Sequence, residues 1–63
     1  MFKASWFNIE LKKIQSAIFK DFLRYHGYRY ESSSCYDFIH FEIFITSEKD
    51  FEKISNFLVF LPD

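Results

Sequence analysis

The sequence predicts a small α+β domain in which helices cover one face of an antiparallel sheet. Three patterns carry this prediction. Apolar residues recur at helical spacing in 9–26, alternate with polar residues in 36–46, and return to helical spacing in 48–58. Short alternating stretches before and after the first helix add two strands, which gives the order β-α-β-β-α. The apolar run 57–61 could add a final strand and complete a ferredoxin-like β-α-β-β-α-β arrangement.

The first strand and the first helix are expected in the amino-terminal part of the chain. Phe2, Ala4 and Trp6 alternate with polar residues, which suits a short strand. Asn8 could cap the helix that follows, and Gly27 stands where a left-handed turn would end it. The apolar stripe of this helix is expected to comprise Leu11, Ile14, Ile18, Phe22 and Tyr25, and to be widened by Ala17, Phe19 and Leu23.

The middle of the chain is expected to form two strands. Tyrosine alternates with charged residues in 28–33, and the serines 32–34 are interpreted as a turn. The strand at 36–46 has the clearest alternation in the chain and would direct four residues toward the helices. These are Ile39, Phe41, Ile43 and Ile45.

The second helix has a recognisable start. Ser47 followed by Asp50 resembles a capping box, with Asp in place of the usual Glu. The apolar residues after it keep helical spacing to about residue 58. Pro62 would end either a helix or a strand at 57–61.

Length and composition predict one domain, 1–63, with more apolar surface than it can bury. The chain is 49% hydrophobic and 24% aromatic. A domain of about 60 residues buries only about 60% of the surface that its unfolded chain exposes. Some of the apolar surface is therefore expected to stay outside, where a partner or a second copy could cover it.

The single cysteine, Cys35, cannot form an internal disulfide or a cysteine-rich metal site, and no metal or cofactor is expected. A secreted domain this small would usually need disulfides. The sequence shows no signal-peptide pattern and no apolar run that approaches a membrane span. A cytoplasmic location without a membrane partner is therefore expected.

The predicted open face of the strand at 36–46 is the first candidate functional surface, because an open sheet face is normally polar. Its residues are Tyr36, Phe38, His40, Glu42 and Phe44. Aromatic side chains held on a rigid sheet make good anchors for a protein partner. A homodimer could also use this face.

The charge distribution adds a preference to this hypothesis. Residues 1–30 carry six basic and two acidic side chains, whereas 31–63 carry two basic and seven acidic ones. The acidic residues Glu48, Asp50 and Glu52 of the second helix would steer the chain toward a basic target. We therefore expect a small interaction module that binds and inhibits or regulates a larger protein. Phage inhibitors of a host enzyme or defence system, and antitoxins, are proteins of this kind, and a nucleic-acid-processing enzyme is one possible target.

A nucleic-acid-binding module is the alternative. Lys13, Lys20, Arg24 and Arg29 would supply the phosphate contacts. The sequence pI of 6.1 argues against it, because nucleic-acid-binding domains are usually basic. Nucleic acid is therefore the less favoured partner.

Catalysis has the weakest support, and the chain is not expected to be an enzyme. His40 and Glu42 share a strand face and could form an acid–base pair. Residues 23–36, a helix end followed by a serine-containing hairpin, resemble HicA-type and VapD-type RNA-cleaving toxins. The chain has 33–35 (Ser-Ser-Cys) and Asn8 where these families are expected to carry their catalytic His or Asp. A toxin-like small ribonuclease is thus a further alternative, and no family is assigned.

Overall fold

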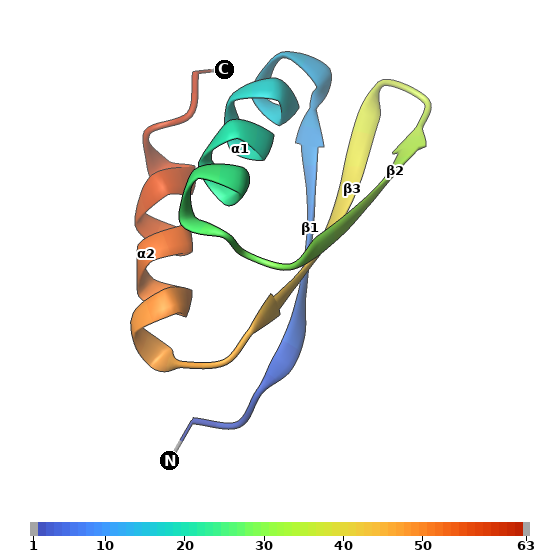
Figure 1. Cartoon of the computed structure of the whole chain (residues 1–63). Coiled ribbons are helices and arrows are strands. Elements are labelled where there is room, and N and C mark those ends of the chain that lie inside the picture. Colours follow the sequence, from blue (N-terminus) through green and yellow to red (C-terminus); the bar gives the residue numbers. More distant parts are fainter. Residues whose placement is uncertain (1, 63) are drawn as a thin grey trace.

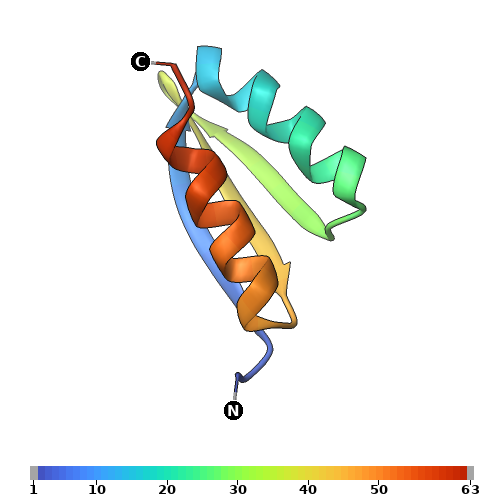
Figure 2. The ribbon, with the colours of Figure 1, turned by 90° about the vertical axis from the view of Figure 1, so that its left-hand side faces the viewer.

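The computed structural model describes residues 2–62, which form a three-stranded antiparallel sheet and two helices. Figure 1 shows the chain order β1-α1-β2-β3-α2, and both helices lie on the same side of the sheet in Figures 1 and 2. This order confirms the predicted β-α-β-β-α succession. The elements are β1 (Ser5–Lys12), α1 (Lys13–His26), β2 (Tyr30–Cys35), β3 (Phe38–Ile45) and α2 (Glu48–Val59).

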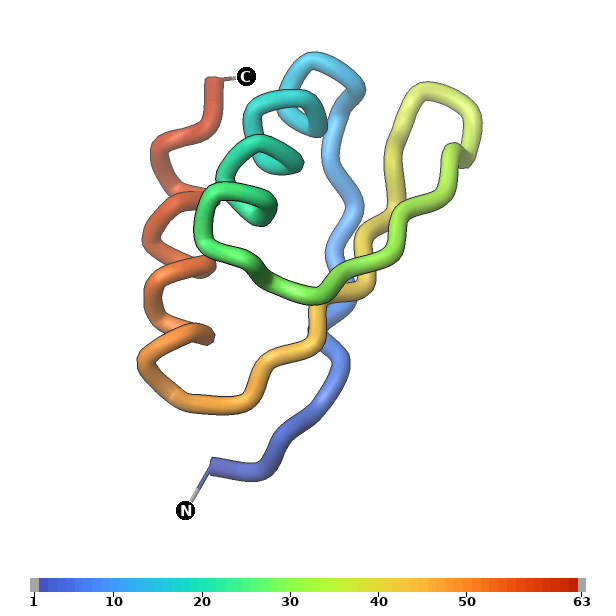
Figure 3. Tube along the Cα trace, viewed as in Figure 1, coloured from blue at the N-terminus to red at the C-terminus, as the bar shows by residue number. Residues whose placement is uncertain are grey.

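The central strand of the sheet is β3, with β1 and β2 on either side of it. Both outer strands are antiparallel to β3, so β1 and β2 run in the same direction, as the chain trace in Figure 3 shows. The unit β1-α1-β2 is therefore a split βαβ unit, with β3 inserted between its two parallel strands.

The final strand of the ferredoxin-like arrangement is not present in residues 2–62. Helix α2 continues through Val59, and 60–61 form a turn. Ile54 is fully buried, and Phe57 and Leu58 pack against the same core from the next turn of the helix. This three- and four-residue spacing keeps the end of the chain helical.

The predicted boundary between the first strand and the first helix was wrong. Strand β1 extends to Lys12, so α1 begins four residues later than expected and Asn8 lies in the strand. The apolar residues of β1 alternate with polar ones and face the helices, beside the inward residues of β3. They are Phe7, Ile9 and Leu11. All eight residues of β1 pair with β3, and this long-range pairing stabilises the extended conformation.

The predicted apolar stripe of the first helix was correct only in part, because two of the residues expected to widen it form its buried side. Phe19 and Leu23 are fully buried, whereas Ile14 is 63% and Tyr25 is 86% exposed. Helix α1 carries apolar residues on two sides, and its spacing alone does not decide which side meets the sheet. The end of the helix is as predicted, because Gly27 adopts φ 72° and donates its N–H to the Arg24 carbonyl at 3.1 Å.

The hairpin between β2 and β3 turns later than predicted. The serines 32–34 belong to β2, and the turn consists of Tyr36 and Asp37. Tyr36 has φ 58°, a left-handed conformation that residues with a Cβ adopt at a cost. The predicted cap of the second helix is confirmed, because the Asp50 N–H donates to Ser47 Oγ at 3.2 Å at the start of α2.

The core lies between the sheet and the two helices. The four predicted inward residues of β3 are confirmed as buried, at 9% exposure or less: Ile39, Phe41, Ile43 and Ile45. The Phe19 ring packs edge-on against Phe41, with centroids 5.1 Å apart. Full burial of one such side chain stabilises a fold by about 1.5–3 kcal/mol. No helix in the described part of the chain is both long and apolar enough to cross a membrane.

Candidate functional site

The side of the sheet that faces away from the helices forms the candidate site, which we call the open sheet face. Side chains alternate between the two faces of each strand, so the register defines its members. They are Trp6, Asn8, Glu10 and Lys12 on β1; Phe38, His40, Glu42 and Phe44 on β3; and Glu31, Ser33 and Cys35 on β2.

Aromatic side chains occupy both ends of the open sheet face. At one end Trp6 lies directly across from Phe44, with ring centroids 5.2 Å apart and an interplanar angle of 54°. At the other end Phe38 is 47% exposed and pairs with Lys12 on one side and Cys35 on the other. Three rings are thus held by a backbone that the core fixes from behind.

Carboxylates occupy the centre of the open sheet face. Glu31 and Glu42 are directly opposite each other in the register, and Glu10 is opposite His40. Like charges in this position destabilise a sheet. Within residues 2–62, no Lys or Arg nitrogen lies within 4.0 Å of these carboxylates, and the one ion-pair contact joins His40 Nε2 to Glu42 Oε1 at 3.9 Å.

The imidazole of His40 also contacts an amide from the neighbouring strand. His40 Nε2 lies 3.2 Å from Asn8 Oδ1, and this oxygen can only accept, so the facing ring nitrogen carries the proton. A shallow groove of about 210 Å³ lies beside His40 and Glu42 and is also lined by Glu31, Ser32 and Ser33 of β2. Two of the residues that line this groove, Glu31 and Glu42, carry carboxylates.

The structure divides the partner-binding residues predicted from the sequence. Phe38, His40, Glu42 and Phe44 lie together on the open sheet face, as predicted. Tyr36 lies outside it, in the hairpin turn, and is 93% exposed. The acidic residues of α2, namely Glu48, Asp50 and Glu52, lie in the helical layer on the other side of the sheet.

Sequence reasoning missed the contribution of the outer strands. Trp6, Asn8 and Glu10 come from β1, and Glu31 comes from β2. The alternation of polar and apolar residues in 7–12 was the available signal for the first group. The position of Glu31 could be predicted only from the register between β2 and β3, and this register depends on where the hairpin turns.

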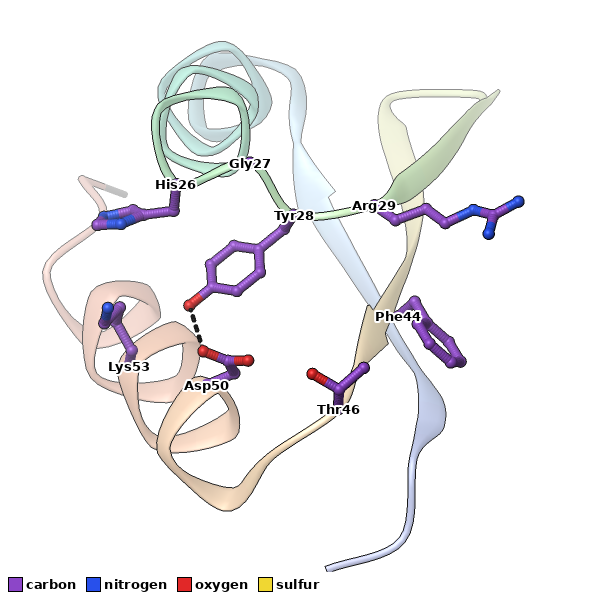
Figure 4. Close-up of a pocket in the computed structure, with 8 residues that line it drawn as sticks. All are labelled: His26, Gly27, Tyr28, Arg29, Phe44, Thr46, Asp50 and Lys53. Carbon is purple, nitrogen blue, oxygen red and sulfur yellow. Dashed lines mark hydrogen bonds between the residues drawn. The ribbon is translucent and has the colours of Figure 1, made fainter.

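The basic residues predicted to contact nucleic acid do not form one surface. Lys13, Lys20 and Arg24 recur along one side of α1 at seven- and four-residue steps. Arg29 follows the helix, and its carbonyl accepts the Phe44 N–H at 2.9 Å. In Figure 4 the Arg29 side chain extends beside Phe44, on the open side of the sheet and away from α2.

A second hollow, of about 360 Å³, lies between the end of α1, the start of α2 and the end of β3. Figure 4 shows Tyr28 crossing it, where the phenol donates a hydrogen bond to Asp50 Oδ1 at 3.1 Å. Burial first, and then this hydrogen bond and the Asp50 charge, raise the pKa of Tyr28 to about 12. The phenol therefore stays neutral at ordinary pH and joins the two helical ends.

Metal binding and nucleophilic catalysis find little support in the described residues. No group of three or more His, Cys, Asp or Glu side chains in 2–62 is arranged to hold a metal ion. Cys35 is exposed on the open sheet face, on a different strand from His40. In residues 2–62, one contact brings an imidazole and a carboxylate together, that of His40 with Glu42.

Comparisons of the chain with protein-family models, curated proteins and solved structures found no match.

Proposed function

We propose that this protein is an interaction module whose open sheet face binds a larger protein and inhibits or regulates it. The partner surface presents an arginine or lysine side chain to the central carboxylates and apolar groups to the aromatic ends. The observation that carries this proposal is the pairing of Glu31 and Glu42 between the aromatic ends, with no Lys or Arg nitrogen within 4.0 Å of either carboxylate in residues 2–62.

The aromatic ends supply the binding energy in this proposal. Trp6 is 41% and Phe38 is 47% exposed, and both are held on a rigid sheet. Large rings with few rotatable bonds lose little entropy on binding, and Trp is among the commonest energetic hot spots of protein interfaces. Burying them against a partner would remove apolar surface that the isolated chain leaves in water.

The central carboxylates supply the preference for a cation. Two opposed glutamates repel each other. A guanidinium placed between them would relieve this repulsion and donate hydrogen bonds to both carboxylates. Arginine is the better fit because its planar group presents several donors at once. The same negative charge disfavours a phosphate backbone on this face.

The hairpin turn gives independent support. Tyr36 holds a left-handed backbone conformation in which glycine would be less strained, and its ring is almost fully in solvent. A conformational cost of this kind is typical of residues kept for contact with another molecule. Its position at the Phe38 end of β3 would extend the aromatic contact beyond the sheet.

Inhibition follows from size in this proposal. A 63-residue chain that lays one face of its sheet on a larger protein can cover a functional surface of that protein without chemistry of its own. A cytoplasmic location is proposed with it, because the only cysteine is a free, exposed thiol.

A matched pair of double variants tests this proposal. Tagged wild-type protein is used to capture its partner from nuclease-treated native lysate, and affinity is then measured with the purified partner. Phe38→Ala combined with Phe44→Ala is expected to weaken binding at least about a hundredfold, because two hot-spot rings are lost. Ile14→Ala combined with Ile18→Ala removes exposed apolar groups from α1 instead and is expected to leave affinity unchanged.

Tyr36→Gly sharpens the test, since it should stabilise the free protein by relieving the turn while weakening binding. Equal affinity of both double variants for the captured partner would refute the proposal. Capture of nucleic acid alone when nuclease is omitted, lost in Lys20→Ala with Arg24→Ala, would support the basic side of α1 instead.

A further inference from the structure

The outer edge of β1 has free backbone groups at defined positions. The Phe44 N–H points to β2, where it meets the Arg29 carbonyl. Hydrogen-bonding direction alternates along a strand, so Ile43 and Ile45 direct their backbone groups to β1. The β1 residues that pair with them, Phe7 and Ser5, direct their backbone groups to β3 in return. The residues that alternate with these in β1 direct theirs outward, away from the sheet. The outward-facing residues are Trp6, Asn8 and Glu10, followed by Lys12.

These outward backbone groups have no hydrogen-bond partner within residues 2–62, apart from one side-chain acceptor at the end of the strand. The Lys12 N–H donates to Gln15 Oε1 at 3.0 Å, which closes the edge where α1 begins. No hydrogen bond within the described chain reaches the backbone groups of Trp6, Asn8 or Glu10. Three consecutive outward residues therefore offer a short ladder for another strand.

The core is also incomplete along this edge. Phe41 and Ile43 on β3 are fully buried, yet their β1 partners Ile9 and Phe7 are only half-buried. Leu11, the third inward residue of β1, is half-buried as well. A strand added beside β1 would cover the sides of these residues that now face water.

The topology points to the same position. A second split βαβ unit, made of β3, α2 and a further strand, would place that strand on the far side of β1. The chain instead ends α2 at Val59, and the sheet has three strands in the described residues. The edge of β1 is thus where a four-stranded version of this sheet would continue.

The sequence of β1 can pair with itself. With Asn8 opposite Asn8 of the second copy in an antiparallel ladder, Trp6 faces Glu10, and Phe7 faces Ile9, twice each by symmetry. No two like charges are opposite in this register, and the central inward pairs each join an aromatic to a branched aliphatic side chain. The outward groups of Trp6, Asn8 and Glu10 are all used, and the Lys12 amide keeps its bond to Gln15.

We propose that two copies of this chain associate through β1 in that register and form a continuous six-stranded sheet. The two-fold axis passes beside Asn8, so the interface is closed and growth stops at the dimer. The helices of both copies lie on one side of the sheet. The two open sheet faces join on the other side, and the aromatic pair of Trp6 and Phe44 comes next to Glu10 of the second copy.

Pulsed electron–electron spectroscopy with a nitroxide on the native Cys35 tests the proposal directly. Cys35 is exposed and lies on β2, away from the proposed interface. Across the proposed sheet, the two β2 strands are five strand spacings of about 4.8 Å apart. Along the strands, each Cys35 lies four residues of about 3.3 Å from the two-fold axis, in opposite directions. Together these displacements place the two Cys35 positions about 35 Å apart. Sedimentation velocity over a wide concentration range gives the dissociation constant of the same sample.

Proline variants separate the two edges of the sheet. Asn8→Pro removes an outward N–H that has no partner in the monomer and is expected to weaken the dimer about tenfold or more. Ser32→Pro does the same at the outer edge of β2 and should leave the dimer intact. Asn8→Ala keeps the N–H, removes the side chain and should also dimerise.

A second substitution at the same position tests the interface even if the proline variant does not fold. Asn8→Asp keeps the acceptor that contacts His40 and places two carboxylates opposite each other across the axis. It should weaken the dimer several-fold, and salt should restore part of the affinity. A monomer at millimolar concentration would overturn the proposal, as would a distance well below 25 Å from pairing through β2 or through the open sheet face.

Discussion

The two faces of β3 differ in what covers them. One face carries four apolar side chains in succession, all buried beneath α1 and α2. The other carries Phe38, His40, Glu42 and Phe44, all at least partly in solvent. Both faces contain aromatic rings, so hydrophobic composition alone does not distinguish them. The helices determine which face holds the fold together.

This difference assigns separate roles to side chains that are neighbours in sequence. Residues on the covered face contribute stability because they leave water when the chain folds. Residues on the open sheet face remain available to another molecule, and the covered face fixes their backbone. Substitutions on the two faces should therefore change different measurements, and this expectation can be tested on one strand.

The largest expected effect comes from two phenylalanines of β3. Phe41 is fully buried against Phe19, so Phe41→Ala should lower the free energy of unfolding by about 3–5 kcal/mol. A chain of this length is stable by only about 3–9 kcal/mol, so little folded protein should remain. Phe44→Ala should cost about 1 kcal/mol, mainly the contact with Trp6. Urea denaturation followed by circular dichroism measures both, and equal losses would contradict the division between the faces.

A smaller effect on stability is expected from the hydrogen bond that joins the end of α1 to the start of α2. Tyr28→Phe removes the bond from its phenol to Asp50 and should cost about 1 kcal/mol. Tyr25→Phe, on a ring that is 86% exposed, is the matched control and should cost almost nothing.

The pH dependence of stability identifies the same bond. The pKa of Tyr28 is about 12 in the folded chain, whereas an unfolded tyrosine titrates near pH 10. Between these values the unfolded chain loses the proton first, so stability should fall as pH rises from about 10 to 12. The fall should be smaller in Tyr28→Phe than in Tyr25→Phe, and identical profiles would show that the phenol titrates alike in both states.

The parts of the fold that the sequence predicted correctly are those fixed by local signals. The inward residues of β3, the Ser47 cap and the Gly27 turn all follow from a few adjacent residues. The start of α1 was misplaced because residues 7–12 fit either helical or strand spacing, and pairing with β3 decides between them. The final strand was an alternative of the same kind, and packing of Ile54 and its helical neighbours decides it.

The candidate site follows the same rule. Its β3 residues were predicted because alternation along one strand is visible in the sequence. The opposition of Glu31 and Glu42 was not, because it depends on a hairpin that turns at 36–37 rather than in the serines. The feature that supports a cationic partner is thus a property of the strand register.

The smallest expected effect tests that feature. Glu31→Gln removes one of two opposed charges and should raise the free energy of unfolding by about 0.2–1 kcal/mol at low salt. The gain should shrink as salt screens the repulsion in the wild type. Glu52→Gln, on the exposed side of α2, removes the same charge without an opposed strand and should not give this gain.

The same substitution should weaken binding of the proposed partner, because its cation loses one of two acceptors. A gain in stability together with a loss in affinity would show that the glutamates are opposed for the benefit of a ligand. If Glu31→Gln stabilised the fold and bound the partner unchanged, the charge pair would be a cost without a role, and the aromatic ends alone would define the interface.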